Sequence, residues 1–403
     1  MTRMTLDGRE ILIGVTGSIA AVESVKLIHA LRRRGAVVQP VMSTAAQGII
    51  HPDALTYASG RDTITRLSGR VEHVAFCGDG GSADLLLIAP CTANTIGKIA
   101  CGIDDTPVTT FATTALGRQM PVVIVPAMHH SMFRHPAVVK NIQILKDWGV
   151  DVAGPDVEEG KAKIAGTAEI VLRCERAVLG EPLAGKRVLI TSGPCREPVD
   201  DVRVLTTRST GLMGQELALE AFRLGANVTV VHGDTLPCVT NIPADTADKM
   251  RYAVEQQFRQ KTPDIYLSAA AISDFAPVRI AGKIPSGRPL YLKLEPLPKL
   301  LDFVLEFSST KVVAFKIGMK TRTAARALLD RGATMVVTNT PASMGTRTGD
   351  YRILTKGESI PAAGDKEEIA AAIWQRLINK TGSGIRHSST GKPDKKRRNG
   401  KST

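Results

Sequence analysis

Two successive repeats of one pattern constrain the fold of this chain more than any other feature. In each repeat, short and continuously apolar segments alternate with segments of helical periodicity. The apolar segments lie at 11–18, 37–43, 84–90 and 122–127 in the first repeat, and at 186–193, 227–233, 264–271, 312–316 and 335–339 in the second. Continuous apolar runs of this length are typical of parallel strands buried on both faces. The sequence therefore predicts an α/β fold of two doubly wound, Rossmann-like domains.

The division of the chain follows from its length and from one short segment. At 403 residues the chain is too long for one ordinary hydrophobic core. A segment containing Gly and Pro at 176–187 separates the two repeats, so we place the domains at 1–180 and 181–380. Residues 381–403 hold seven basic residues against one acidic residue. This composition is typical of a basic disordered tail, and contact with RNA or another anionic partner is the alternative.

The overall charge and the cysteines exclude several classes of protein. The formal net charge is +13, and the tail accounts for a large part of it, so we expect no nucleic-acid partner. The remaining positive charge suits a protein that handles phosphorylated anions. The six cysteines lack C-x-x-C spacing, which argues against a zinc site and a disulfide framework and favours buried free thiols. Since no apolar run approaches the ~20 residues of a membrane span, we expect a cytoplasmic protein without a membrane partner.

Polar turns at two strand ends of the first domain indicate an anion-binding site. Gly17 permits a tight turn after the first strand, and Ser18 can cap the following helix or bind phosphate. The turn lacks the G-x-G-x-x-G pattern, which argues against NAD. Thr92, Asn94 and Thr95 stand at the head of a helix that we expect to begin near Ile96. Simple capping of that helix is the alternative interpretation.

Four segments, in this order, resemble the homo-oligomeric flavin-containing cysteine decarboxylases over residues 11–175: GVTGSIA (14–20), VEHVAF (71–76), APCTANTIGKIACGIDD (89–105) and PAMHHSMFRHP (126–136). The resemblance implies a flavodoxin-like flavoprotein domain that binds FMN. It implies that His73 is the active-site histidine, a residue type that can help to deprotonate the substrate thiol. The residues implied to contact FMN, or for the last one to lie near the flavin or a subunit boundary, are Gly17, Ser18, Ile19, Ser43, Thr92, Asn94, Thr95 and Asp105.

The first domain departs from this family's pattern at two places. The family's substrate motif is commonly P-x-M-N-x-x-M-W, whereas this chain has Met128 followed by His129, where the asparagine binds the substrate carboxylate. A histidine can still donate a hydrogen bond there. The family's substrate-loop cysteine has no counterpart in 154–166, which carries Glu158, Lys161 and Lys163 instead. We expect Lys163 or Lys161 to take the acid or charge-binding role; an ordinary charged loop is the alternative.

Segments of the second domain resemble the phosphopantothenate–cysteine ligase domain over residues 186–376. They are SGPCREPVDD (192–201), SAAAISDFAP (268–277), KIPSGRP (283–289), VVAFKIGM (312–319) and MVVTNT (335–340). In that family a nucleotide, CTP or ATP, activates the substrate carboxylate as an acyl-nucleotide, and the amine of cysteine displaces the nucleotide. The resemblance implies that Lys283 is catalytic, that Asp274 binds the nucleotide and Mg²⁺, and that Thr207 and Arg208 contact substrate. It also implies a nucleotide-binding set of Ala269, Ala270, Ala271, Asp274, Lys283 and Phe315; core packing is the alternative for the last.

The ligase motifs also lose polar groups relative to the family. Thr207 replaces an asparagine, Leu212 replaces a lysine, and a further helix lysine appears as Ala327. Positive charge around the nucleotide phosphates is thereby reduced. The candidates to restore it are Arg208, Arg326 and Arg331.

Together the two resemblances imply a bifunctional enzyme of coenzyme A synthesis with archaeal-like departures from the common motifs. It would join 4'-phosphopantothenate to cysteine with CTP and Mg²⁺, and then decarboxylate phosphopantothenoylcysteine to 4'-phosphopantetheine with FMN. The family resemblance also implies a homo-oligomer. Two alternatives stay open: an FMN-dependent cysteine decarboxylase with an inactive ligase domain, and a non-enzymatic flavoprotein regulatory subunit.

Overall fold

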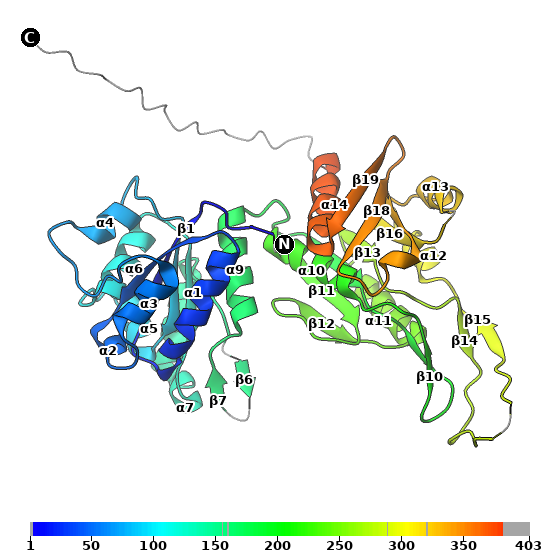
Figure 1. Ribbon diagram of the computed structural model, residues 1–403, viewed down its shortest axis with the longest axis horizontal. Coiled ribbons are helices and arrows are strands. Elements are labelled where there is room, and N and C mark those ends of the chain that lie inside the picture. The colour runs from blue at the N-terminus through cyan, green and yellow to red at the C-terminus, as the bar shows by residue number, and fades with distance from the viewer. Residues whose placement is uncertain (1–2, 155, 159–160, 288, 320, 382–403) are drawn as a thin grey trace, which may run out of the picture.

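The computed structural model describes residues 3–154, 156–158, 161–287, 289–319 and 321–381. Its first domain is built on a parallel five-stranded sheet in the order β2-β1-β3-β4-β5 (Figure 1). The strands are β1 (Glu10–Val15), β2 (Val37–Met42), β3 (Leu85–Cys91), β4 (Val122–Pro126) and β5 (Asp151–Val152). This is the order of doubly wound flavodoxin-like folds.

Helices cover both faces of the first sheet because successive strand residues point to opposite sides. Ile11 and Ile13 pack in one buried cluster, whereas Leu12 between them packs in the other. One face is covered by α1 (Ser24–Arg33), α3 (Pro52–Ser59) and α9 (Thr167–Leu179), and the other by α5 (Ala93–Ala100), α6 (Pro107–Gly117) and α8 (Pro136–Asp147).

The second domain contains an eight-stranded sheet in the order β12-β11-β8-β13-β16-β17-β18-β19. The first six strands are parallel and the last two are antiparallel. The strands are β8 (Arg187–Thr191), β11 (Asn227–His232), β12 (Thr240–Pro243), β13 (Ile265–Ser268), β16 (Lys311–Ile317), β17 (Met335–Asn339), β18 (Thr348–Leu354) and β19 (Ser359–Asp365). The predicted pair of doubly wound, Rossmann-like α/β sheets is therefore confirmed.

Three strands of this sheet escaped prediction because they lack a continuous apolar run. In β12, β18 and β19, buried or half-buried positions are interspersed with exposed ones. The two faces of the sheet are covered by α10 (Leu212–Arg223) and α14 (Lys366–Thr381) on one side, and by α11 (Ala247–Gln260), α12 (Leu300–Val304) and α13 (Arg322–Asp330) on the other.

Two antiparallel pairs project from the second domain. One is an arm formed by β14 (Phe275–Pro277) and β15 (Leu294–Pro296); the other is the pair β9 (Arg196–Pro198) and β10 (Val204–Thr206) (Figure 1). A third pair, β6 (Asp156–Glu158) and β7 (Lys161–Lys163), belongs to the first domain.

The cysteine and membrane expectations can be compared with the structure. Cys77, Cys91, Cys174 and Cys195 are buried free thiols, but Cys101 is exposed because it ends α5 at the surface, and Cys238 is half-buried. Within the described ranges, no helix is both long and apolar enough to cross a membrane. The predicted basic tail falls almost entirely at 382–403, outside the described residues.

Candidate active sites

The predicted flavin-binding turns lie at one edge of the first sheet. Gly17, Ser43 and Thr92 follow the carboxyl ends of β1, β2 and β3, which are adjacent strands. The crevice between β1 and β3 is the point where the strand order reverses, and open α/β sheets bind ligands at such points. The fold therefore places these turns where a flavin phosphate can be held.

Three side chains at this edge cap short helical segments. Ala20 N–H donates to Ser18 Oγ at the start of the 3₁₀-helix η1 (Ile19–Glu23) (3.4 Å), and Ala46 N–H donates to Ser43 Oγ at the start of α2 (Thr44–Gln47) (3.4 Å). The N–H of Thr95 donates to Thr92 Oγ1 (3.3 Å). Hence α5 begins at Ala93 and not near Ile96, because Thr92 is its N-cap.

A hydrogen-bonded bridge joins the turns after β1 and β3. Thr16 Oγ1 donates to the carbonyl oxygen of Pro90 (2.7 Å) and accepts from Thr92 N–H (3.0 Å). Thr16 is buried, so the bridge is shielded from water. It fixes the spacing of the two loops that flank the crevice.

Gly17 is required by a close backbone approach, which gives a first testable prediction. A Cβ at this position would lie 2.6 Å from Ala45 Cβ, so Gly17→Ala must displace the 43–47 turn. Overpacking of this kind costs about 1–3 kcal/mol, and we expect about a 5- to 150-fold loss of flavin affinity. Flavin titration followed by fluorescence quenching measures it. Gly117→Ala is the control because its Cβ meets nothing within 4 Å; equal affinity in both variants would contradict the prediction.

His73 lies on α4 (Glu72–Cys77), a short helix whose N-cap residue, Val71, has φ of 46°. Its side chain is half-buried, and the described residues provide no hydrogen-bond partner for its buried Nδ1 atom. A buried ring nitrogen without a partner loses free energy unless a ligand or water pairs with it. Among the described residues, this ring nitrogen is therefore enclosed without a hydrogen bond.

His129 is exposed and caps α7 (His130–Phe133). Its Nδ1 accepts from Ser131 N–H (3.3 Å) and lies 2.8 Å from Ser131 Oγ. Because Nδ1 accepts, the neutral ring carries its proton on Nε2 and can donate from there. The strand β7 lies against α7, which brings the backbone of the predicted substrate loop close to His129. The side chains of Glu158, Lys161 and Lys163 fall outside the described residues.

The other predicted residues of the first domain vary in their surroundings. Met128 is half-buried and Thr95 is buried, whereas Ile19 and Asn94 are exposed. Asp105 is exposed and forms an ion pair with Lys98 (2.7 Å). Exposed apolar and amide side chains beside a crevice remain free to contact a ligand or a neighbouring subunit.

Two cavities in the second domain lie at the carboxyl ends of β13, β16 and β17. The larger has a volume of about 300 Å³ and the smaller about 130 Å³. Ala270 and Phe315 line both cavities, so the aromatic ring that was predicted to contact a base stands between them. Asp274 lines the larger cavity only, and Ala269, Ala271 and Asn339 line the smaller.

The glycine-containing loop before α10 packs against the turn after β8. Ser192 Oγ donates to the carbonyl oxygen of Gly211 (3.1 Å), and a Cβ on Gly214 would lie 2.6 Å from Ser192 Cβ. A glycine at 214 is therefore needed for the first turn of α10 to approach the sheet. This approach places residues 209–214 along the wall of the smaller cavity.

The structure does not bring Lys283 to either cavity. Lys283 is exposed on the arm between β14 and β15, and neither cavity is lined by it. Its neighbours are anchored: Ile284 N–H donates to Asp200 Oδ2 (3.0 Å) and Gly282 N–H donates to Asp201 Oδ2 (3.1 Å). Sequence spacing alone gave no indication of this separation, because the arm's position depends on these distant carboxylates.

The Asp200 anchor leads to a second prediction. Burial works to raise the pKa of Asp200, but three backbone N–H groups, led by that of Ile284, outweigh it and hold the pKa at about 2. Since this folded pKa lies below the ordinary value, the anchor is intact at neutral pH and is lost only as the pH falls through about 2. We expect Asp200→Asn to increase amide exchange at Ile284 about tenfold. The control is Asp248→Asn, at an exposed position in the first turn of α11. Unchanged protection of the Ile284 amide from hydrogen exchange would contradict the proposed role of Asp200 as an anchor of the arm.

Of the three arginines predicted to restore positive charge near the nucleotide, one lines a cavity and two do not. Arg331 lines the larger cavity and forms an ion pair with Asp302 (2.7 Å), and Ala327 lines the same cavity. Arg326 and Arg208 are exposed and line neither cavity. Thr207 is half-buried in the loop that leads to the smaller cavity.

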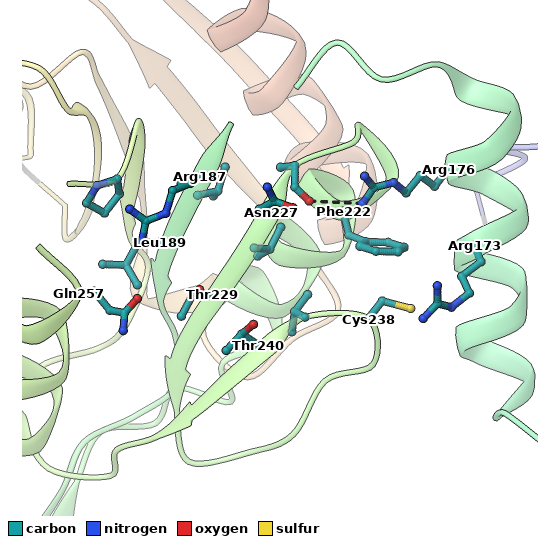
Figure 2. A pocket seen from close by; sticks show the side chains of 15 residues that line it. Arg173, Arg176, Arg187, Leu189, Phe222, Asn227, Thr229, Cys238, Thr240 and Gln257 are labelled. Atoms are coloured by element: carbon teal, nitrogen blue, oxygen red, sulfur yellow. Dashed lines mark hydrogen bonds between the residues drawn. The ribbon is translucent and has the colours of Figure 1, made fainter. Parts of the chain in front are cut away.

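A third cavity, of about 330 Å³, lies where the domains meet (Figure 2). Arg173 and Arg176 reach it from α9, and Arg187 from the start of β8. All three arginine side chains already have partners within the protein. Arg173 pairs with Asp151 (2.7 Å), Arg176 lies 4.8 Å above the ring of Phe222, and Arg187 donates to a backbone carbonyl. The cavity lies at the amino ends of β8, β11 and β12, opposite the edge where α/β sheets bind ligands.

Comparisons with known proteins agree with this two-part architecture. The flavoprotein family model matches residues 2–178, and the model of the DNA/pantothenate metabolism flavoprotein C-terminal domain matches residues 183–380. The coenzyme A biosynthesis bifunctional protein CoaBC of Thermococcus kodakarensis is 42% identical over 389 residues, which cover 92% of this chain and 95% of the relative. The Methanocaldococcus jannaschii protein of the same name is 34% identical over 391 residues, covering 92% and 94%.

Among solved structures, the crystal structure of the C-terminal domain of CoaBC is 27% identical, with a TM-score of 0.43, and the match covers 50% of this chain and 98% of that one. The two family models together span nearly all of the described chain. Because both family models match and these relatives are matched over 95% and 94% of their own length, the chain belongs to the family of coenzyme A biosynthesis bifunctional proteins.

Proposed function

We propose that the second domain joins 4'-phosphopantothenate to cysteine with CTP and Mg²⁺, and that the first domain decarboxylates the product to 4'-phosphopantetheine with FMN. The observation that carries the proposal is that one chain has polar turns at the carboxyl edge of its first sheet and two cavities at the carboxyl edge of its second sheet. The relatives' shared name, coenzyme A biosynthesis bifunctional protein, supports it over the length of the chain.

FMN fits the first crevice on structural grounds. Gly17 leaves no room for a side chain, and Ser18, Ser43 and Thr92 surround one edge with small polar groups and helix N-termini. When bound, the flavin supplies the acceptance and return of two electrons. The chain's own part is to take the thiol proton at the half-buried imidazole ring of His73 and to orient the substrate carboxylate with Nε2–H of His129.

The ligase chemistry rests on the two cavities of the second domain. Asp274 is exposed at the larger cavity, and the described residues contain no cluster of three or more metal-ligating side chains. Magnesium is commonly held by one or two carboxylates together with substrate phosphates and water, so Asp274 suits an ion that arrives with the nucleotide. For Lys283 to act on that nucleotide, the arm must move, or a second subunit must supply its own arm, as expected of a homo-oligomer.

The proposal is tested by incubating purified, flavin-loaded protein with 4'-phosphopantothenate, cysteine and either CTP or ATP, and following products by mass spectrometry. We expect 4'-phosphopantetheine, CO₂ and, with CTP, CMP and pyrophosphate. Accumulation of phosphopantothenoylcysteine would show an inactive first domain. Conversion of added phosphopantothenoylcysteine alone would show a decarboxylase with an inactive ligase domain, and no product in any arm would favour a regulatory flavoprotein.

A further inference from the structure

A pocket of about 650 Å³ lies in the second domain, between the first turn of α13 and the strands β17, β18 and β19. Of the described residues that line it, two are basic and none is acidic. We call it the α13 pocket, and its polar lining residues are Thr321, Arg322, Thr323, Thr338, Arg352 and Ser359. A lining of arginines and hydroxyl groups without a carboxylate is typical of a site for an oxyanion.

Thr338 faces the α13 pocket from the sheet. It is the partner of Arg352 across β17 and β18, and paired residues of antiparallel strands point to the same face. The next pair on that face, Val336 and Leu354, packs in one cluster with α13. Thr338 is 8% exposed, and among the described residues its hydroxyl has no hydrogen-bond partner. The hydroxyl is therefore free to donate to a molecule in the pocket.

Two arginines border the pocket without an ion-pair partner among the described residues. Arg322 is the exposed first residue of α13, where a cation is disfavoured by the helix dipole. Arg352 is exposed on β18 and donates from Nη1 to Ser359 Oγ (3.4 Å). That one contact leaves most of the five N–H donors of its guanidinium unused.

The nearby carboxylates do not neutralise these arginines. Glu358 precedes Ser359 in the chain, but it pairs with Arg376 of α14. Asp350 shares the α13 face of β18 with Arg352, because it lies two residues before it. Asp350 does not line the pocket, however, and it forms no ion pair with a described residue. The positive charge of the pocket is thus left without a counter-charge from the described part of the chain.

The first turn of the nine-residue helix α13 adds backbone donors to the same space. Its N-cap residue, Thr321, makes no side-chain capping hydrogen bond. The first N–H groups of a helix have no acceptor within the helix, and they carry partial positive charge. Phosphate groups bind at such helix N-termini. An uncapped helix start, two arginines and the hydroxyl of Thr338 therefore border one pocket.

The α13 pocket is separate from both ligase cavities. Arg322 and Thr323 of α13 line the pocket, whereas Ala324 and Ala327 of the same helix line the larger cavity. No described residue that lines the pocket lines either ligase cavity. A ligand in the pocket can therefore be bound at the same time as a ligand in the larger cavity.

We propose that the α13 pocket binds a free phosphate or pyrophosphate anion. Arg322, Arg352, the hydroxyl of Thr338 and the first amides of α13 bind the oxygen atoms of the anion. The site goes beyond the proposed ligase function, because binding there requires no turnover. Pyrophosphate would be a product of that ligase, whereas inorganic phosphate has no part in its reaction.

Hydrogen exchange followed by mass spectrometry tests the site in the flavin-loaded, full-length protein. Peptides that contain the first turn of α13 are compared in phosphate, in pyrophosphate and in chloride at equal ionic strength, without added metal ions. At about ten times its Kd, the bound anion should slow exchange of these amides about tenfold, and chloride should not. The anion that protects at the lower concentration is the preferred ligand.

Variants of the pocket give the second measurement. We expect Arg352→Met to weaken binding of the protecting anion about tenfold or more, and Thr338→Val about three- to tenfold, because each loses a hydrogen bond to a charged ligand. Arg352→Lys should recover part of the affinity. Thr338→Val keeps the branched shape of the side chain, so its packing against α13 is retained. The matched control is Arg259→Met, at an exposed position of α11 outside the pocket, which should bind like the wild type.

Three results would overturn the proposal. The first is equal exchange in phosphate, pyrophosphate and chloride. The second is protection that stays unchanged in both Arg352→Met and Thr338→Val. The third is an anion that adds no protection when CTP is present in excess, because CTP and the anion would then share one site. An inactive ligase domain would leave these measurements intact, and a failed anion site would leave the proposed ligase in place.

Discussion

Replacing His73 by asparagine is expected to slow CO₂ release from phosphopantothenoylcysteine by about 100- to 10,000-fold, the range of general acid–base catalysis by one positioned group. The physical reason is the state of its ring: His73 is half-buried, and its Nδ1 is enclosed without a partner among the described residues. Asparagine keeps a polar side chain of smaller size but cannot accept a proton near neutral pH.

The measurement is a stopped assay of CO₂ or 4'-phosphopantetheine, with flavin content and ligase rate followed in parallel. Both should stay near the wild-type values, because α4 lies in the first domain and Nδ1 supports no other described contact. His29→Asn is the matched control: His29 is a half-buried histidine on α1. A His73→Asn enzyme that kept its decarboxylation rate would exclude His73 from proton transfer.

The second large effect is expected at the junction of the two domains. Arg223 on α10 is 1% exposed and pairs with Glu175 of α9 (2.6 Å), with Glu220 (3.1 Å) and with Glu367 of α14 (3.3 Å). From the first domain, Arg34 joins the same cluster. Burial works to lower the pKa of Arg223, but the carboxylates, led by Glu175, outweigh it and raise the pKa. Arg223 therefore stays charged, and its ion pairs bridge the domains.

Arg223→Met should destabilise the protein by about 3–5 kcal/mol, because it leaves buried carboxylates without their central cation. Two of these, Glu175 and Glu367, lie on α9 and α14, which flank α10. We expect calorimetry to show a lower midpoint temperature for the first unfolding transition, and separate unfolding of the two domains. Arg259→Met, at an exposed position of α11, should change stability little. If both variants unfolded in the same transitions at the same midpoint temperatures, the cluster would not couple the domains.

Much of the fold was accessible from the sequence because it depends on local chemistry. Continuous apolar runs identified β1 to β4 and the parallel strands β8, β11, β13, β16 and β17, since strands buried on both faces need apolar residues at every position. The missed strands β12, β18 and β19 show the limit of this signal. Their partly exposed faces leave no unbroken run.

Among the candidate site residues, too, some positions followed from the local sequence and others depended on the tertiary structure. Residues that follow strand ends, such as Gly17 and Thr92, were placed correctly at the sheet edge because a parallel sheet gathers its carboxyl ends. Their roles in binding stay predictions. Lys283 is different: its motif was readable, but the arm that carries it is held away from both cavities by Asp200 and Asp201.

By itself, the sequence determined two doubly wound sheets and the polar turns at their edges, because strand burial and turn chemistry are set within a few residues. Only the tertiary structure decided which distant charges meet. Arg34, Glu175, Arg223 and Glu367, which are far apart in the chain, converge between the domains. Such contacts depend on how helices pack across a sheet, and no local periodicity records them.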